Sequence, residues 1–349
     1  MTDDIEQREP DQLDGVGLPE YQTDVVGHTA ARAGLSALLN ESRLPSGVLI
    51  HGPQGIGKAT LAFDLAREIF RRTGDEDPSH VATQVAAGAY PNLRVLRKAP
   101  RETGKGFYTV IRVEEVRELI ERLHKTRGRA GYRVVIVDPI DDCNTSSANA
   151  LLKILEEPPP DTLFLLISHR PGQLLPTVKS RCHQVALRPL SDEDVRAVLA
   201  RGMPKADATA LDRAVAMAGG RPRRGFEALQ MTDRGILSGL GAWLTDPIRP
   251  PVAAHLALAD TLGADKDGPA TRFARDMIID WVAAEARMAA GLGPAGRGRL
   301  ASANELWDKA HALFADADDY NLDARQTLIV IFDAIRKHVH SHSSFIESS

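Results

Sequence analysis

The sequence predicts an α/β domain with a parallel sheet, followed by two smaller helical domains. Three observations support this prediction. Short apolar, β-branched runs alternate with helical patterns as far as Pro189. A glycine-rich loop that ends in a lysine follows the first of these runs and opens a helical pattern. Beyond Met231 the chain is rich in alanine and leucine at helical spacing and carries no strand signal.

Length and composition limit the class of protein. A chain of 349 residues suggests two or three domains, and 43% hydrophobic with 26% charged residues suits globular packing. The net charge of −4 gives no overall basic field for nucleic acid. Two cysteines, Cys143 and Cys182, cannot by themselves build a disulfide framework or a four-ligand zinc site. With no signal peptide or long apolar span, we expect a cytoplasmic protein that does not enter a membrane.

The strand candidates have both faces apolar. They are Gly47–His51, Arg133–Val137 and Thr162–Ile167, and a helix is expected over Ala59–Phe70. Strands that are apolar on both faces and separated by helices indicate a parallel sheet covered on two sides.

The character of the sequence divides the chain further. The first residues are polar and rich in Asp, Glu and Pro, and Ser191 looks like a helix N-cap with Asp194 at the capping-box position. We expect a flexible tail over 1–20, the α/β domain over 21–189, a helical lid over 190–231, a helical oligomerisation domain over 232–340 and a frayed tail over 341–349.

The loop after the first strand has the pattern of a phosphate-binding loop. Its glycines are Gly52, Gly55 and Gly57, and Lys58 follows them. In such a loop the backbone N–H groups surround phosphate oxygens, the helix N-terminus adds positive charge, and the lysine reaches the β- and γ-phosphates. The alternative is a fortuitous glycine-rich turn.

One position departs from this motif. The residue after the lysine is normally Ser or Thr, whose hydroxyl binds Mg²⁺, but here it is Ala59, and Thr60 comes one place later. A shift of one residue on a helix turns the side chain by about 100°. Thr60 is therefore a poor replacement, and we expect nucleotide binding to be weak and metal to be held poorly.

A second departure lies at the end of the strand Arg133–Val137. Asp138 stands where an aspartate approaches Mg²⁺, and Pro139 takes the place of the glutamate that would polarise the attacking water. Asp141 and Asp142 follow, and we favour loop acids or helix caps for them. Two losses, of the metal ligand and of the base, predict a chain that does not hydrolyse ATP.

The segment after the acidic strand resembles a known family. Residues 147–159 read SANALLKILEEPP and residues 176–182 read PTVKSRC. The first string resembles the ANALLKxLEEPP block of clamp-loader AAA+ proteins, and the second resembles their Ser-Arg-Cys motif. The resemblance is clear over Val26 to Gln230 and fainter beyond.

The resemblance implies a RecA-like P-loop AAA+ domain, a helical lid and an all-α collar. It implies a part in loading the sliding clamp onto primed DNA within DNA polymerase III, with gamma/tau and delta subunits as partners. Ala59 and Pro139 favour a member of the family that does not hydrolyse ATP. No cofactor is required on this view, and no zinc is expected, because the segment from Thr73 to Tyr90, which matches the family's zinc module, has no cysteine.

Three further residues take their roles from the resemblance. Arg181 would act as an arginine finger on a neighbouring subunit's nucleotide, and the alternative is a surface arginine that caps the preceding helix or pairs with an acid. Ser168 stands at the first sensor position, where a strand-end cap is the alternative. Arg224 aligns with a nucleotide-sensing arginine, where a plain basic turn is equally compatible. Two rival functions remain open, namely an active gamma/tau-type ATPase and another AAA+ replication or recombination factor.

Overall fold

The computed structural model describes residues 9–41, 43–74, 77–103, 106–125, 128–231, 234–264, 269–320 and 322–343. The chain divides into two compact units, Met1–Leu229 and Gln230–Ser349. This division lies beside the boundary that the sequence predicts between residues 231 and 232. The exact domain limits remain predictions.

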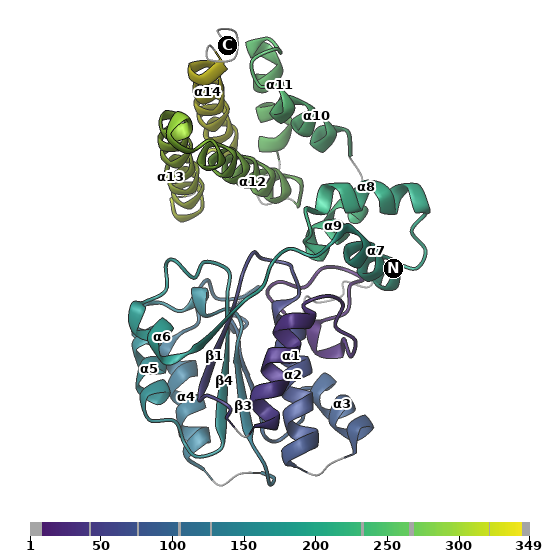
Figure 1. Cartoon of the computed structure of the whole chain (residues 1–349), viewed down its shortest axis with the longest axis vertical. Coiled ribbons are helices and arrows are strands. Elements are labelled where there is room, and N and C mark those ends of the chain that lie inside the picture. Colours follow the sequence, from purple (N-terminus) through teal and green to yellow (C-terminus); the bar gives the residue numbers. More distant parts are fainter. Residues whose placement is uncertain are drawn as a thin grey trace. The chain divides into compact units, whose positions relative to one another are not determined.

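The first unit contains a five-stranded, fully parallel sheet (Figure 1). Its order is β2-β3-β4-β1-β5, and the strands are β1 (Gly47–His51), β2 (Leu93–Leu96), β3 (Arg133–Val137), β4 (Thr162–Ser168) and β5 (His183–Ala186). The loop of interest follows β1, which lies between β4 and β5. This arrangement confirms the predicted RecA-like P-loop α/β fold.

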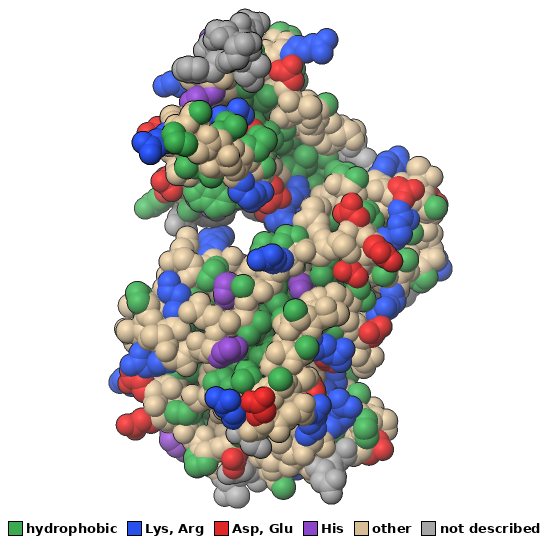
Figure 2. Space-filling view, viewed as in Figure 1, with side chains coloured by type: hydrophobic (Ala, Val, Ile, Leu, Met, Phe, Trp, Pro, Cys, Tyr) green, Lys and Arg blue, Asp and Glu red, His purple; other side chains and the backbone are tan. Residues whose placement is uncertain are grey.

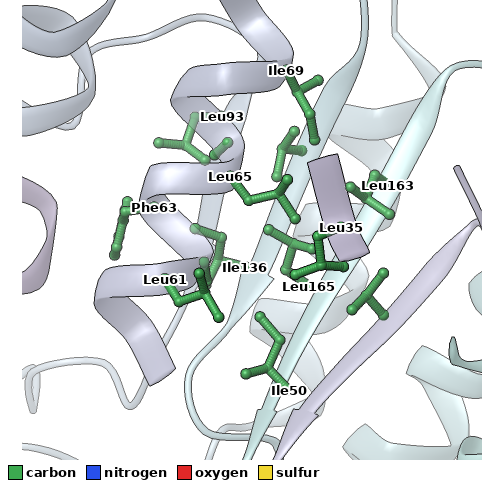
Figure 3. Close-up of a cluster of buried hydrophobic side chains, with 14 of the residues drawn as sticks. Leu35, Ile50, Leu61, Phe63, Leu65, Ile69, Leu93, Ile136, Leu163 and Leu165 are labelled. Atoms are coloured by element: carbon green, nitrogen blue, oxygen red, sulfur yellow. The ribbon is translucent and has the colours of Figure 1, made fainter. Parts of the chain in front are cut away.

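Helices cover both faces of the sheet (Figure 1). One side carries α1 (Thr29–Asn40), α2 (Lys58–Thr73) and α3 (Pro78–Ala86), and the other carries α4 (Val113–His124), α5 (Thr145–Glu156) and α6 (Pro176–Arg181). Because strand side chains alternate between faces, neighbouring residues enter different cores. Leu165 packs in the first core with Leu35 and Leu61, while Leu166 packs in the second with Leu151 (Figure 3 shows the first core).

Three short helices complete the first unit, and they occupy the predicted lid. They are α7 (Asp192–Gly202), α8 (Ala208–Ala218) and α9 (Pro222–Gln230). The Ser191 side chain accepts a hydrogen bond from the Asp194 amide and caps α7, as the sequence predicts. Asp207 caps α8 in the same way. These caps satisfy amides that a helix start would otherwise leave unpaired.

In its described residues the second unit consists of helices joined by loops and contains no strand, as the sequence predicts. Its helices are α10 (Arg234–Thr245), α11 (Val252–Gly263), α12 (Pro269–Gly291), α13 (Arg297–Asp319) and α14 (Ala324–Ser343). Helix α13 packs against α12 and α14, and α11 packs against α14. Buried Trp243 lies against Phe332, with ring centroids 4.8 Å apart, so it is a packing residue.

Where the structure describes them, the two ends of the chain form helical elements, and the first residues also form ion pairs. Residues 1–8 and 344–349 lie outside the described residues. Pro19–Tyr21 form a 3₁₀ turn, η1, and Glu9 and Glu20 form ion pairs with Arg97. The flexibility predicted for residues 1–20 remains a prediction, while helix α14 continues to Ser343.

Two surface properties bear on partners. In the described residues, no helix combines the length and the apolar character needed to cross a membrane. On the face in Figure 2, basic and acidic side chains are interspersed. That face therefore carries no single-sign field of the kind that attracts nucleic acid over long distances.

Candidate functional site

The loop from Gly52 to Lys58 joins β1 to α2 and has the shape of a phosphate cradle. Gly52, Gly55 and Gly57 all have positive φ angles, of 148°, 81° and 99°. A Cβ on Gly52 would lie 2.5 Å from the Leu187 carbonyl oxygen, and one on Gly55 would lie 2.6 Å from the Arg223 Cβ. Glycine is therefore required at both positions by conformation and by space.

Lys58 is folded back onto its own loop. Its Nζ donates hydrogen bonds to the carbonyl oxygens of Gly52 at 2.7 Å and Pro53 at 2.6 Å. Burial lowers the pKa of Lys58 from 10.5 to about 7, and the nearby carboxylates of Asp138 and Asp141 offset only part of this effect. The lysine is in the predicted place, but two oxygens of its own loop accept hydrogen bonds from it.

Asp138, at the end of β3, is already paired with a cation. The Arg97 guanidinium places both Nε and Nη2 at 3.2 Å from the same Asp138 carboxylate oxygen. Burial raises the pKa of Asp138, and the ion pair with Arg97 opposes that shift. Arg97 also contacts Glu20 and Glu9, each at 3.3 Å. The sequence reasoning missed Arg97, Glu9 and Glu20.

The two acids after Pro139 also have fixed partners. Asp142 pairs with Lys98 at 3.0 Å. Asp141 accepts hydrogen bonds from the Ser168 hydroxyl at 2.9 Å and from the amides of His169 at 2.6 Å and Arg170 at 3.2 Å. Asp141 therefore joins the carboxyl ends of β3 and β4.

These residues do not fit a magnesium-bound nucleotide. Ala59 has no hydroxyl, Asp138 and Asp142 are paired with cations, and Pro139 offers no proton acceptor. Thr60 is half-buried and borders the cavity described next. The arrangement retains a cradle for phosphate but lacks ready ligands for the metal.

A cavity of about 460 Å³ lies beside the loop. Gly55, Gly57, Lys58, Thr60 and Asp138 line it, which brings together five of the predicted residues. The rest of its lining comes from residues 9–28, from the ends of β2, β3 and β4, and from the lid helices. Its volume lies in the range of ordinary small-molecule sites.

Neither predicted sensor residue lines the cavity, but in each case a residue next to it in the sequence does. Ser168 is fully buried and serves as a hydrogen-bond donor to Asp141, while its neighbour His169 lines the cavity. Burial and nearby cations lower the pKa of His169 to about 3, so it is neutral at physiological pH. Arg224 is buried in α9, and Arg223 lines the cavity instead.

Arg223 connects the lid to the phosphate loop. Its backbone amide donates to the Gly55 carbonyl at 3.2 Å, and its side chain pairs with Glu227 at 3.0 Å. Gly52, at the start of the loop, is not part of the cavity lining.

Arg181 lies at the end of α6, away from this lining, and its side chain is exposed. Its Nη1 donates to the Thr177 carbonyl at 3.0 Å, and its Nη2 lies 2.6 Å from Glu156 of α5. A guanidinium has five N–H donors, so these two contacts leave donors available. The contacts are those of the alternative interpretation, a helix-capping surface arginine, and they do not test a role across a subunit boundary.

Comparisons with known proteins agree with the family resemblance. Residues 27–191 match the family model described as DNA polymerase III, delta subunit. The chain is 40% identical over 178 residues to the DNA polymerase III subunit delta' of Pseudomonas aeruginosa, covering 50% of this chain and 52% of that protein. It is 34% identical over 187 residues to the gamma/tau subunit of Mycobacterium bovis, covering 52% of this chain and 31% of that protein.

The extent of these matches limits what they establish. The chain spans about half the length of the delta' relative and about a third of the gamma/tau relative. A solved gamma-subunit-related protein from Thermotoga maritima is 16% identical, with 87% of this chain and 99% of that chain covered and a TM-score of 0.41. At that score, the similarity adds nothing to the strand order as evidence for the fold. Over residues 27–191, the chain is therefore similar to subunits of DNA polymerase III.

Proposed function

We propose that the chain is a delta-prime-type clamp-loader subunit that does not hydrolyse ATP. In this role it assembles with gamma/tau and delta subunits in the cytoplasm, helps to open the sliding clamp and places it on primed DNA. The observation that carries the proposal is the state of Asp138, which is paired with Arg97 and followed by Pro139. A carboxylate held by a guanidinium is a poor magnesium ligand, and proline cannot accept a proton from water.

The rival functions make different use of the same site. A gamma/tau-type ATPase needs a metal ligand after the lysine and an acid after Asp138, and both are missing. This rival function is still considered because the chain is similar to gamma/tau subunits. A different AAA+ replication or recombination factor would share the fold but would not assemble with the clamp-loader subunits.

In the proposed assembly, Arg181 serves a neighbour's active site. Arg181 is an exposed residue, and its guanidinium carries a permanent charge and retains free N–H donors beside those used by Thr177 and Glu156. Such a group stabilises the charge that develops on a transferring phosphoryl group. The nucleotide would be the neighbour's, so the chain needs no complete site of its own.

The test is the clamp-dependent ATP hydrolysis of a reconstituted clamp loader that carries Arg181→Ala. We expect turnover to fall by the share of the site that Arg181 serves, because loss of an arginine finger costs that site a factor of about 10³ or more while other sites continue to turn over. Arg213→Ala is the matched control, since Arg213 is also exposed and also donates to a carbonyl of its own helix, that of Thr209. Unchanged turnover with Arg181→Ala would remove the finger from the proposal.

A further inference from the structure

One segment of the chain forms much of the wall of the cavity at the phosphate loop. This segment, residues 9–26, is called the N-terminal strap below. Residues 9–13, 16–19, 22 and 24–26 all border the cavity, as do Gln54 to Thr60 of the phosphate loop. The strap would therefore lie beside a nucleotide bound in this cavity.

Contacts along its length fix the strap to the first unit. Arg67 of α2 donates to the carbonyl oxygen of Glu20 at 3.1 Å and also to that of Gln22. Near its end, Asp24 pairs with Arg201 of the lid at 2.9 Å. Near its start, the Asp11 carbonyl accepts a hydrogen bond from Arg223. Core and lid both hold the strap.

The central contact is the ion cluster around Arg97. The Arg97 guanidinium forms ion pairs with the carboxylates of Glu9, Glu20 and Asp138. The side chains of Arg97 and Glu20 are each only 12% exposed. Close charges that are this well shielded interact more strongly than a surface pair. The two strap carboxylates thus share their cation with the aspartate that a magnesium-bound nucleotide would use.

Electrostatics disfavour a bound nucleotide while the strap is docked. With all three acids ionised, the cluster carries more negative than positive charge, so phosphate oxygens beside it meet like charge. Arg97 forms ion pairs with Glu9 and Glu20, and Lys58 donates hydrogen bonds to the carbonyl oxygens of its own loop. A phosphate could recruit Arg97 only after the strap carboxylates had moved.

We propose that the N-terminal strap is a built-in competitor of nucleotide, which lowers the affinity of the cavity for nucleotide through the pairing of Glu9 and Glu20 with Arg97. The strap carboxylates and the phosphates of a nucleoside triphosphate compete for the same cation. By linkage, whatever undocks the strap raises the affinity for nucleotide, and a bound nucleotide undocks the strap to the same extent. The proposal concerns this chain's own cavity and does not rest on the role of Arg181.

The test is equilibrium binding of a fluorescent ATP analogue, mant-ATP, to the full chain with and without Mg²⁺. The Glu9→Gln/Glu20→Gln variant removes both strap charges but keeps the size of each side chain and the carbonyl contacts to Arg67. We expect it to bind mant-ATP at least about tenfold more tightly than the unaltered chain. Circular dichroism confirms that each variant is folded.

The matched control is Glu102→Gln/Glu118→Gln, which changes the net charge equally. Glu102 pairs with Arg112 and Glu118 pairs with Arg122, and neither carboxylate lines the cavity. We expect this variant to bind like the unaltered chain. Hydrogen exchange of residues 9–24 should also rise in the strap variant and not in the control.

Two outcomes would overturn the proposal. Equal affinity of the unaltered chain and the strap variant would show that Glu9 and Glu20 do not compete with nucleotide. Failure of both to bind would show that something other than the strap excludes it. Neither outcome bears on assembly with clamp-loader subunits, which a co-purification experiment tests separately.

Discussion

Single residues decide whether this phosphate loop can work as a catalytic one. The glycines, Lys58 and Asp138 could be predicted from the sequence, because a local motif fixes their positions between one strand and one helix. The ion pair between Asp138 and Arg97 could not be predicted, because the two residues are far apart in the sequence. Glu20, the other partner of Arg97, is farther from Arg97 still. No local pattern signals such a contact.

The sensor positions show a second limit of sequence reasoning at this scale. On a helix, adjacent side chains point about 100° apart, so neighbouring residues meet different surroundings, and the sensor role of Arg224 remains a prediction. Arg223 lines the cavity while Arg224 is buried in the lid, and no spacing rule separates the two in advance.

Lys58 should give the protein a distinctive pH dependence. Its folded pKa of about 7 lies below its ordinary value of 10.5, so between these values the unfolded chain holds a proton that the folded chain has released. The free energy of unfolding contributed by this group therefore rises with pH across that window. Lys58→Met removes this group. The free energy of unfolding of the variant, relative to that of the unaltered protein, should be greater at pH 7 than at pH 9.5 by roughly 1–3 kcal/mol.

Urea unfolding at the two pH values measures this difference. Lys153→Met, at an exposed position on α5, serves as the control and should show no such change. Parallel pH profiles for the unaltered protein and Lys58→Met would contradict the assignment of a strongly lowered pKa.

Gly55 should tolerate no side chain, for two separable reasons. Gly55→Ala places a Cβ at a positive φ and 2.6 Å from the Arg223 Cβ, so we expect a loss of about 2–4 kcal/mol in the free energy of unfolding. Gly88→Ala is the matched control, because Gly88 also has a positive φ but has no atom within 4 Å of the added Cβ. It should cost only about 1 kcal/mol. Equal losses in urea unfolding would mean that the contact with the lid is easily relieved.

At the scale of elements, buried strands were more predictable than edge strands. Central strands β1, β3 and β4 are almost wholly buried, and the apolar sequence of each revealed it. The edge strands β2 and β5 have four residues each with mixed exposure, so neither produces a continuous apolar run. Their existence depends on pairing with β3 and β1, which the sequence does not encode locally.

Helices α5 and α6 together hold the proposed finger. Glu156 of α5 lies 2.6 Å from Arg181 of α6 and would fix the orientation of a side chain that otherwise has up to about 2 kcal/mol of rotamer entropy to lose. If Arg181 acts in trans, Glu156→Gln should lower kcat of the reconstituted complex in the same direction as Arg181→Ala but by less, with little change in KM for ATP. Glu157→Gln, which alters the adjacent exposed carboxylate, should leave both values unchanged.

The same assay distinguishes positioning from mere stability. An effect of Glu156→Gln on complex assembly or KM alone would indicate a structural role at the α5–α6 surface. Identical kcat values for the two glutamine variants would show that the ion pair does not prepare Arg181 for catalysis.

On the scale of the whole molecule, the order of elements was predictable and the role of the first residues was not. A parallel sheet, then a lid, then helices follows from the change in periodicity along the chain. The polar start of the chain predicts a tail, whereas residues 9–26 border the cavity and pair with Arg97, Arg67 and Arg201. Charged residues suit a solvated tail and a docked strap equally well, so composition alone cannot distinguish them.

The central claim is that this molecule keeps the architecture of a nucleotide-hydrolysing domain without its chemistry. Steady-state ATP hydrolysis by the purified chain, free of partners and at saturating Mg²⁺ and ATP, tests it most directly, with Lys58→Ala measured in parallel and an active clamp-loader ATPase as positive control. The account predicts background turnover that is the same for the unaltered chain and for Lys58→Ala. Turnover well above background that disappears in Lys58→Ala would contradict it.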